Sequence, residues 1–272
     1  MSARMSTAVV TIAHGRHDHL ARQAEALTRS TERPGVHVVV AMDDPVLSRV
    51  VPQAEVVHLP REDGRLPLAA ARNAGVARAR ALGAELVVLL DVDCLPAPGL
   101  LARYRSASTS YDGVLCGPVG YLPPAGPDGY AAEGLRALAV PHPARPVPAD
   151  DEVLPADDPD LFWSLSFALT GATWDRVGGF CEDYTGYGGE DTDFGQALAA
   201  AGVAMWWVGG AWAYHQHHGG GGVPVQHLDD VLRNAGVFHR RWGRWPMAGW
   251  LAEFERRGLA RPDPLTGRWA RA

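Results

Sequence analysis

A short aliphatic run, Leu86–Leu90, leads directly into the acidic triplet Asp91-Val92-Asp93. A run of this length without polar alternation predicts a strand buried on both faces of a sheet. The segments that alternate with it are strands expected at 8–13 and 36–42 and helices expected at 20–30 and 68–82. Strands that alternate with helices favour βαβ units, so we expect an α/β fold with a mostly parallel twisted sheet flanked by helices.

The composition is that of a globular protein with a sizeable core. The chain has 272 residues, of which 47% are hydrophobic, and this length suits one large α/β domain or two small ones. The 25 basic and 31 acidic residues give a formal net charge of −6. A general nucleic-acid-binding protein would have a basic balance, so nucleic acid is not an expected partner.

The cysteines and the apolar runs indicate a cytoplasmic location. Cys94, Cys116 and Cys181 have no CxxC spacing and cannot all pair, so neither a disulfide framework nor a zinc finger is expected. There is no run of about 18 apolar residues, the length a membrane span needs. Residues 1–7 are polar and lack the apolar core of a signal peptide.

The second half of the chain differs in composition from the first. Residues 118–160 are rich in proline and acids and are expected to be irregular, either a flap over the site or a solvated surface loop. Beyond them we expect a strand at 161–168, a helical turn at 173–177, a helix at 191–201, a strand at 203–208 and a helical part at 228–257. All nine tryptophans follow residue 160. Most should be core, although aromatic faces also suit sugar rings.

These segments suggest a division at residue 222. The expected main domain, 1–222, contains a nucleotide-binding half at 1–117, the proline-rich loop at 118–160 and an acceptor and catalytic half at 161–222. A helical extension is expected at 223–272. Its arginines lie among tryptophans, which favours either peripheral membrane contact or packing over the core with the arginines reaching outward; we expect packing.

A second acidic segment, YGGEDTD at 187–193, crowds Glu190, Asp191 and Asp193 behind two glycines. Carboxylates this close repel one another unless a cation, a hydrogen-bond network or a reacting hydroxyl uses them. Ligands of open α/β sheets bind at the carboxyl ends of strands, where Asp91 and Asp93 are expected, and carboxylate oxygens favour Mg²⁺ or Mn²⁺. The two acidic segments together predict a metal-assisted active site. Asp193, which enters the helix, is expected to be only a helix N-terminal charge.

Three other polar groups allow more than one interpretation. Asp43 and Asp44 end the second expected strand and could bind a base or ribose, or simply form a turn before Pro45. Arg72 could bind phosphate, brace a strand-end carboxylate or remain solvated. In the segment 212–218 (WAYHQHH) a single metal would not take all three histidines, because neighbouring positions on a strand alternate faces. His215 is favoured as a ligand and His217 comes second.

The order and spacing of these motifs over roughly residues 7–218 resemble the family 2 glycosyltransferases, which have the GT-A fold. The motifs are the first strand with its loop, the Asp43 strand end, ARNAG at 71–75, DVD at 91–93, VGGF at 177–180 and GGED at 188–191. The last two resemble the C-terminal half of galactosyltransferases and polypeptide N-acetylgalactosaminyltransferases. The sequence departs from the family at AMDDP, where Asp-Asp-Gly-Ser is usual; the proline removes a backbone donor and weakens the expected base contact of Asp43.

The resemblance implies a hexosyltransferase (EC 2.4) that uses a nucleotide-sugar donor, by default a UDP-sugar, and Mn²⁺ or Mg²⁺. Nucleotide-sugar contacts are implied for Ala13, His14, Gly15, Arg16, Asp43, Arg72, Asp91 and Val92. Metal ligation is implied for Asp93, His215 and Asp91, with His217 as a further candidate. A sugar and acceptor pocket is implied for Trp163, Tyr187, Gly188 and Gly189.

The expected reaction is inverting transfer to an acceptor hydroxyl on a glycan, a lipid-linked sugar or a small molecule. Asp191 matches the family's catalytic base, and Glu190 would bind a sugar. One alternative is a nucleotidyltransferase, but that class needs a glycine-rich phosphate loop and residues 13–18 contain one glycine. Another is a non-catalytic sugar-binding protein, which would be expected to have lost one of the acidic motifs.

Overall fold

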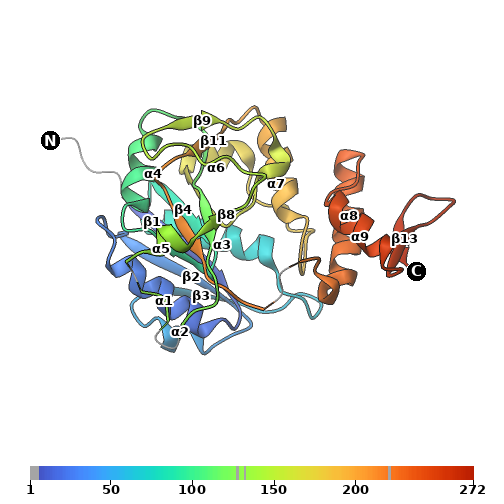
Figure 1. Ribbon diagram of the computed structural model, residues 1–272, viewed down its shortest axis with the longest axis horizontal. Helices are drawn as coiled ribbons and strands as arrows, with labels where there is room; N and C mark the ends of the chain where they lie inside the picture. Colours follow the sequence, from blue (N-terminus) through green and yellow to red (C-terminus); the bar gives the residue numbers. More distant parts are fainter. Residues whose placement is uncertain (1–5, 127–128, 132, 220–221) are drawn as a thin grey trace.

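A mixed eight-stranded sheet forms the centre of the computed structural model, which describes residues 6–126, 129–131, 133–219 and 222–272 (Figure 1). In spatial order the strands are β3 (Glu55–Leu59), β2 (Val36–Met42), β1 (Thr7–Ala13), β4 (Leu86–Leu90), β10 (Ser166–Thr170), β6 (Val114–Cys116), β11 (Met205–Val208) and β9 (Val153–Pro155). The first four run parallel. β10 is antiparallel to both of its neighbours, and β9 is antiparallel to β11. The α/β class is therefore confirmed, with strand directions mixed in the second half.

Helices cover both faces of the sheet. They are α1 (His17–Thr28), α2 (Leu47–Val50), α3 (Leu68–Ala81), α4 (Leu100–Ser108), α6 (Gly171–Val177) and α7 (Glu190–Ala200). Helix α3 lies close to β1 and β2 because Gly75 has no side chain: a Cβ there would come within 2.4 Å of Val10 Cγ1. This close approach places the preceding turn of the helix, which contains Arg72, against the end of β4.

A smaller sheet completes the main body and differs from what we expected of residues 118–160. It contains β5 (Cys94–Pro96), β12 (Ala213–His215), β7 (Val119–Tyr121) and β8 (Val140–Pro141). Two of these strands, as well as β9 of the main sheet and α5 (Leu135–Leu138), come from the segment expected to be irregular. That expectation was wrong because proline is tolerated in edge strands, and both Pro141 in β8 and Pro155 in β9 lie there.

Other boundaries moved as well. The strand expected at 161–168 begins only at Ser166, after a 3₁₀ turn at Pro159–Leu161. The helical part expected at 228–257 is two helices, α8 (Leu228–Trp242) and α9 (Ala248–Arg256), which follow a 3₁₀ turn at Val225–His227. Gly243 ends α8 with a φ of 71°, a conformation that glycine adopts without cost.

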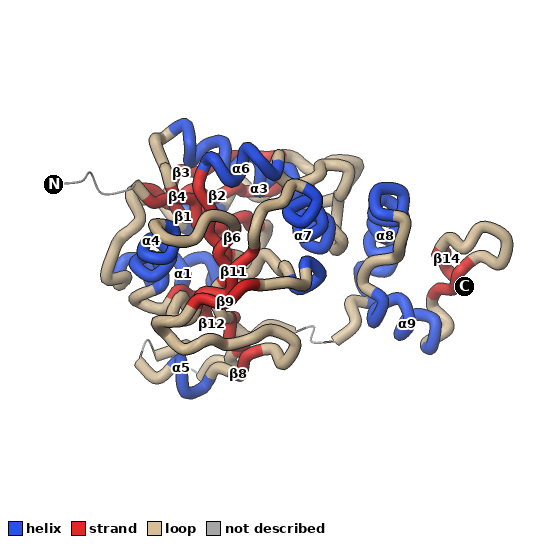
Figure 2. Tube along the Cα trace, turned by 90° about the horizontal axis from the view of Figure 1, so that it is seen from above, coloured by secondary structure: helices blue, strands red, loops and turns tan. Residues whose placement is uncertain are grey.

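The C-terminal extension stands beside the main body, with α8 facing α7 (Figure 2). It ends in a hairpin of β13 (Ala260–Pro262) and β14 (Trp269–Arg271), which was not predicted. Among the described residues, no helix combines the length and the apolar character needed to cross a bilayer.

Asp193 joins the main body to the C-terminal extension, which corrects its expected role as a helix N-terminal charge. Its side chain is buried, and its Oδ1 accepts hydrogen bonds from the Tyr184 hydroxyl at 3.0 Å and from Arg241 Nε and Trp242 Nε1 at 2.7 Å each. A carboxylate this deeply buried needs such partners. Asp193 therefore anchors α8 to α7.

Candidate active site

Arg72 is buried at the centre of a group of carboxylates. Its Nη1 lies 3.2 Å from Glu190 Oε1 and 3.8 Å from Asp191 Oδ1, and its Nη2 lies 3.5 Å from Asp91 Oδ1. The acids come from the end of β4 and the start of α7, so one guanidinium links two distant parts of the sequence. Arg72 is thus not a solvated helical arginine but a brace for the strand-end carboxylates.

Burial changes the protonation of this group. It raises the pKa of Asp91 to about 7, with the charges of Asp93 and Asp191 adding to the effect and Arg72 opposing it. Burial and the charge of Asp191 likewise raise the pKa of Glu190 to about 7. Burial also acts to lower the pKa of Arg72, but the carboxylates outweigh it and raise that pKa. Around neutral pH the arginine is therefore cationic while Asp91 and Glu190 can still hold protons.

Asp191 is the carboxylate of this group that is both oriented and reachable. Its Oδ2 accepts from the Ser164 backbone N–H at 2.9 Å and its Oδ1 from the Ser164 hydroxyl at 2.5 Å, while its side chain remains 27% exposed. Glu190 Oε2, next to it, is buried and has no hydrogen-bond partner in the part of the chain that the structure describes. An acid held by two donors beside an unpartnered oxygen suits contact with a ligand's hydroxyl groups.

The glycines that precede these acids are required by the backbone. Gly188 and Gly189 have φ angles of 91° and 94°, which L-residues with side chains rarely adopt. A Cβ on Gly189 would lie 3.1 Å from Tyr184, and one on Gly188 would lie 3.2 Å from Met247. Tyr187, before them, stacks on His227 with ring centroids 4.6 Å apart. Asn234 of α8 would lie 3.4 Å from the Cβ on Gly189, and Trp250 of α9 would lie 3.5 Å from the Cβ on Gly188. Both helices therefore shape the loop, as well as its own sequence.

A candidate metal centre lies at the other end of the DVD triplet. Ligand atoms of Asp93, His215 and His218 all lie within 4.8 Å of one another. The antiparallel pairing of β12 with β5 places His215 opposite Cys94, next to Asp93. One carboxylate and two imidazoles form a mixed oxygen and nitrogen donor set that suits Mn²⁺ or Zn²⁺ better than Mg²⁺.

Two predicted ligands lie outside this centre, and one member was missed. His217 is exposed, with its backbone N–H bonded to the Tyr130 hydroxyl, and Asp91 contacts Arg72 instead. The face-alternation argument did not find His218 because β12 ends at His215, and the period of two no longer applies beyond the strand.

Burial and the contacts among Asp93, His215 and His218 shift the pKa values of all three side chains. The pKa of His218 is raised, mainly by its hydrogen bond to Asp93, and burial lowers the pKa of His215. Burial acts to raise the pKa of Asp93, but the hydrogen bond from His218 and the charges of both histidines lower it overall. A carboxylate that stays ionised beside two imidazoles is ready to accept a cation.

The loop after β1 is held by Asp44 rather than by Asp43. The Asp44 carboxylate accepts from the Gly15 N–H and lies 2.8 Å from His17 Nε2, which fixes the turn through Gly15 and Arg16, both with positive φ. Asp43 is half exposed and pairs with Arg61 at 2.7 Å. The loop from Ala13 to Arg16 thus lies at the carboxyl end of β1. Val92 packs against the core beneath it.

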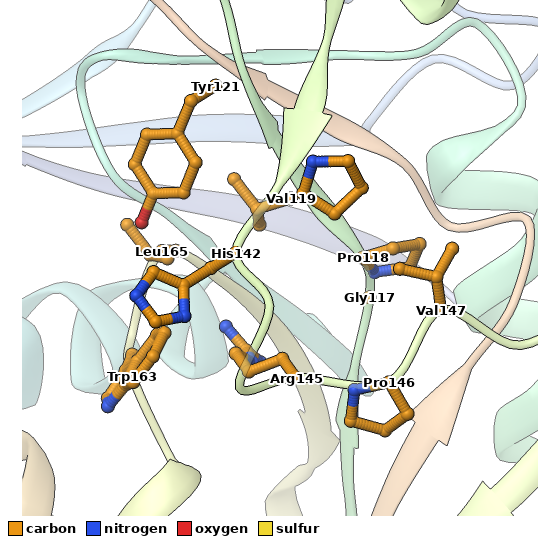
Figure 3. A pocket seen from close by; sticks show the side chains of 11 residues that line it. Gly117, Pro118, Val119, Tyr121, His142, Arg145, Pro146, Val147, Trp163 and Leu165 are labelled. Atoms are coloured by element: carbon orange, nitrogen blue, oxygen red, sulfur yellow. The ribbon is translucent and has the colours of Figure 1, made fainter.

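Trp163 lines a recess at the edge of the site (Figure 3). Its ring meets His142 edge-on, with centroids 4.8 Å apart. Across the recess, the Tyr121 ring lies 4.9 Å from that of His215. Tyr121 thus connects the recess to the metal centre, and the lining residues Trp163 and Leu165 flank Ser164, which holds the Asp191 carboxylate.

The comparisons with known proteins agree with the predicted fold and with the glycosyltransferase resemblance. A family model described as the N-terminal domain of galactosyltransferase matches residues 158–218, which include Asp191 and all three histidines of the 212–218 segment. The solved structure of GalNAc-T7 with UDP, GalNAc and Mn²⁺ superimposes with a TM-score of 0.60 at 15% identity, over 94% of this chain and 57% of that one. The chain has the GT-A glycosyltransferase fold. This confirms the predicted fold and the predicted glycosyltransferase resemblance.

Two further relatives extend the comparison. The structure of S. aureus TarS, residues 1–349, gives a TM-score of 0.54 at 14% identity and covers 85% of this chain and 65% of that one. Validoxylamine A glucosyltransferases from two subspecies of Streptomyces hygroscopicus, jinggangensis (strain 5008) and limoneus, are each 44% identical over 57 residues, 21% of this GT-A chain. The chain spans only 14% and 13% of those two proteins.

Proposed function

We propose that this chain is a metal-dependent, inverting glycosyltransferase that moves a sugar from a nucleoside diphosphate to an acceptor hydroxyl. One observation carries the proposal. A candidate metal centre at Asp93, His215 and His218 and an oriented carboxylate at Asp191 flank the same strand end. GalNAc-T7, which shares the fold, is described with UDP and Mn²⁺, and this supports UDP as the donor nucleotide and Mn²⁺ as the metal.

In this proposal Asp191 is the catalytic base. The acceptor oxygen attacks the anomeric carbon, its proton passes to a carboxylate oxygen of Asp191, and the bond to the diphosphate breaks with its electron pair leaving on the diphosphate. The two hydrogen bonds from Ser164 hold the carboxylate in position for that transfer. Attack from the side opposite the leaving group in one displacement inverts the anomeric centre.

The remaining residues of the site bind the donor and neutralise its charge. A divalent cation at Asp93, His215 and His218 would offset the charge that develops on the diphosphate. The unpartnered Oε2 of Glu190 accepts a hydrogen bond from a sugar hydroxyl. Arg72 holds the carboxylates of Glu190 and Asp191 in position. The nucleoside lies against the loop at residues 13–16, near Asp43, Asp91 and Val92.

The test is an Asp191→Asn variant, with Asp183→Asn as the matched control because Asp183 is an exposed acid that lies shortly before the 187–193 segment. UDP binding is measured by calorimetry with and without Mn²⁺, and UDP release is measured with a panel of UDP-, GDP- and dTDP-sugars. We expect Asp191→Asn to keep Mn²⁺-dependent UDP binding and to lose turnover by at least 100-fold, since general-base catalysis contributes about 10²–10⁴-fold.

Two results would count against the proposal. Turnover that survives in Asp191→Asn at the level of Asp183→Asn removes the base assignment. Mn²⁺-dependent nucleotide-sugar binding with no turnover of any donor by the unaltered chain indicates a sugar-nucleotide-binding protein instead of an enzyme.

A further inference from the structure

Arg145 has no counter-ion among the residues that the structure describes. It lies between β8 and β9, and its Nη1 and Nη2 atoms are buried with no hydrogen-bond partner. Among the residues that the structure describes, no carboxylate lies within ion-pair distance of it. Its guanidinium lies over the rings of Trp207 and Trp163, at 4.6 and 5.4 Å from the ring centroids. Aromatic faces offset only part of the cost of removing a charge from water, so the site is incomplete without an anion.

Arg136 is an arginine with a similar aromatic contact whose charge is paired with an acid. Arg136 belongs to the same 118–160 segment and lies over the Trp212 ring at 3.5 Å. Unlike Arg145, it also has an acid, Asp150, at 3.4 Å, and it is exposed. The difference between the two arginines is the missing carboxylate and the burial, and both point to a partner that the described residues do not supply.

The place of Arg145 identifies the kind of partner. It lines the recess of Figure 3 together with Trp163, Tyr121 and His142. The recess has a free volume of about 10 Å³, enough for roughly one oxygen-sized atom, and exposed side chains such as His142 form its rim. Of its lining residues, Tyr121 contacts the ring of His215, and Trp163 and Leu165 flank Ser164, which donates to Asp191. We therefore assign a group that enters the recess to a sugar bound at the proposed reaction site.

We propose that this recess is an oxyanion subsite, in which Arg145 binds a carboxylate or phosphate oxygen carried by one of the two sugars that meet at the site. The planar guanidinium fork suits both groups, and a sugar hydroxyl would leave the charge unmatched. Binding requires the exposed rim at 142–144 to shift outward by enough to admit the anion. The inference rests on the proposed function and adds a substrate class to it: an acidic or phosphorylated sugar.

The experiment compares sugars that differ only in charge. Binding is followed by tryptophan fluorescence, since Trp163 and Trp207 flank the subsite. For the acceptor, the probes are methyl glucuronide, methyl glucoside and glucose 6-phosphate, added to the UDP- and Mn²⁺-loaded protein. For the donor, UDP-glucuronate is compared with UDP-glucose on protein loaded with Mn²⁺ alone, because bound UDP would occupy the nucleotide site. The variants are Arg145→Met and the matched control Arg136→Met.

We expect one acidic probe to bind at least tenfold more tightly than its neutral partner, and we expect Arg145→Met, but not Arg136→Met, to abolish that preference. Which probe responds distinguishes carboxylate from phosphate and donor from acceptor. Because Arg145 is an unmatched buried charge, the Tm of Arg145→Met should equal or exceed that of the unaltered chain. A lower Tm would assign Arg145 a structural role and overturn the subsite.

The inference is also overturned if acidic and neutral probes bind equally, if no acidic probe binds, or if Arg145→Met keeps the preference. These failures differ from failure of the proposed function. That failure would appear in the unaltered chain as absence of Mn²⁺-dependent UDP binding, which involves no sugar and is therefore independent of Arg145, or as absence of turnover with every donor tested.

Discussion

Replacing Arg72 by methionine tests the central claim about the site, that one buried guanidinium holds its carboxylates together. Methionine has a similar length and can fill the same space, so the change removes charge and leaves packing nearly intact. In the native protein the arginine lies within 3.2–3.8 Å of Glu190, Asp91 and Asp191. Without it, three carboxylates share a site that has no other described cation in contact.

The size of the effect should depend on pH, and its sign follows from the raised pKa values. Asp91 and Glu190 have pKa values of about 7 in the folded chain, above their ordinary values of 3.8 and 4.5. The folded state therefore binds more protons than the unfolded state between about pH 4 and 7, and stability falls as the pH rises through that range. At pH 8 both acids are ionised and need Arg72. At pH 5.5 both are protonated, and only Asp191 pairs with it.

The free energy of unfolding should respond accordingly. Breaking a buried ion pair by removing one partner costs about 3–5 kcal/mol, and we expect a loss of this order for Arg72→Met at pH 8. At pH 5.5 the remaining contact is to the partly exposed Asp191 at 3.8 Å, so the loss should be about 1 kcal/mol. Urea unfolding of the metal-free protein at the two pH values measures both, with Arg72→Lys as the control that keeps the charge. Equal losses at pH 5.5 and 8 would refute the reasoning.

Two further predictions concern the residues around this centre. His218→Ala should weaken Mn²⁺ binding by about 10–100-fold, measured by calorimetry, whereas His217→Ala should leave it unchanged because His217 is exposed and outside the ligand group. Asn234→Ala should lower kcat at least tenfold while UDP–Mn²⁺ binding and the KM for the donor stay within a factor of two. Its amide donates to the carbonyls of Thr185, Tyr187 and Gly188, just before the proposed base. A parallel fall in UDP binding would mean that Asn234 only maintains the fold.

Local patterns were enough to locate most of the site. The apolar run Leu86–Leu90 marked the buried strand, and the DVD triplet after it lies at the strand's carboxyl end, as the βαβ pattern predicts. The positive φ angles of Gly188 and Gly189 are likewise a local property that glycine signals. His218 was missed because the chain leaves β12 before it, and side-chain direction beyond a strand depends on the loop.

Non-local contacts could not be predicted in this way. Asp193 binds Arg241 and Trp242, which are 48 and 49 residues away in the sequence. Both lie in α8, and a hydrophobic period in the sequence does not predict where that helix packs. The strands within 118–160 were missed because proline argues against strands in general, and only the topology shows that β8 and β9 are edges.

The C-terminal extension supports the loop that leads to the proposed base. The family resemblance covers only about residues 7–218, yet the loop before Asp191 is held from α8. Asn234 is fully buried and its amide donates to three backbone carbonyls of that loop. Asp230 accepts from the Tyr187 N–H at 3.2 Å. Gly186 is needed because a Cβ there would lie 2.3 Å from the Asp230 carboxylate. Since a misplacement of about 1 Å can cost 10²-fold in rate, the geometry of the proposed base depends on a segment outside the resemblance.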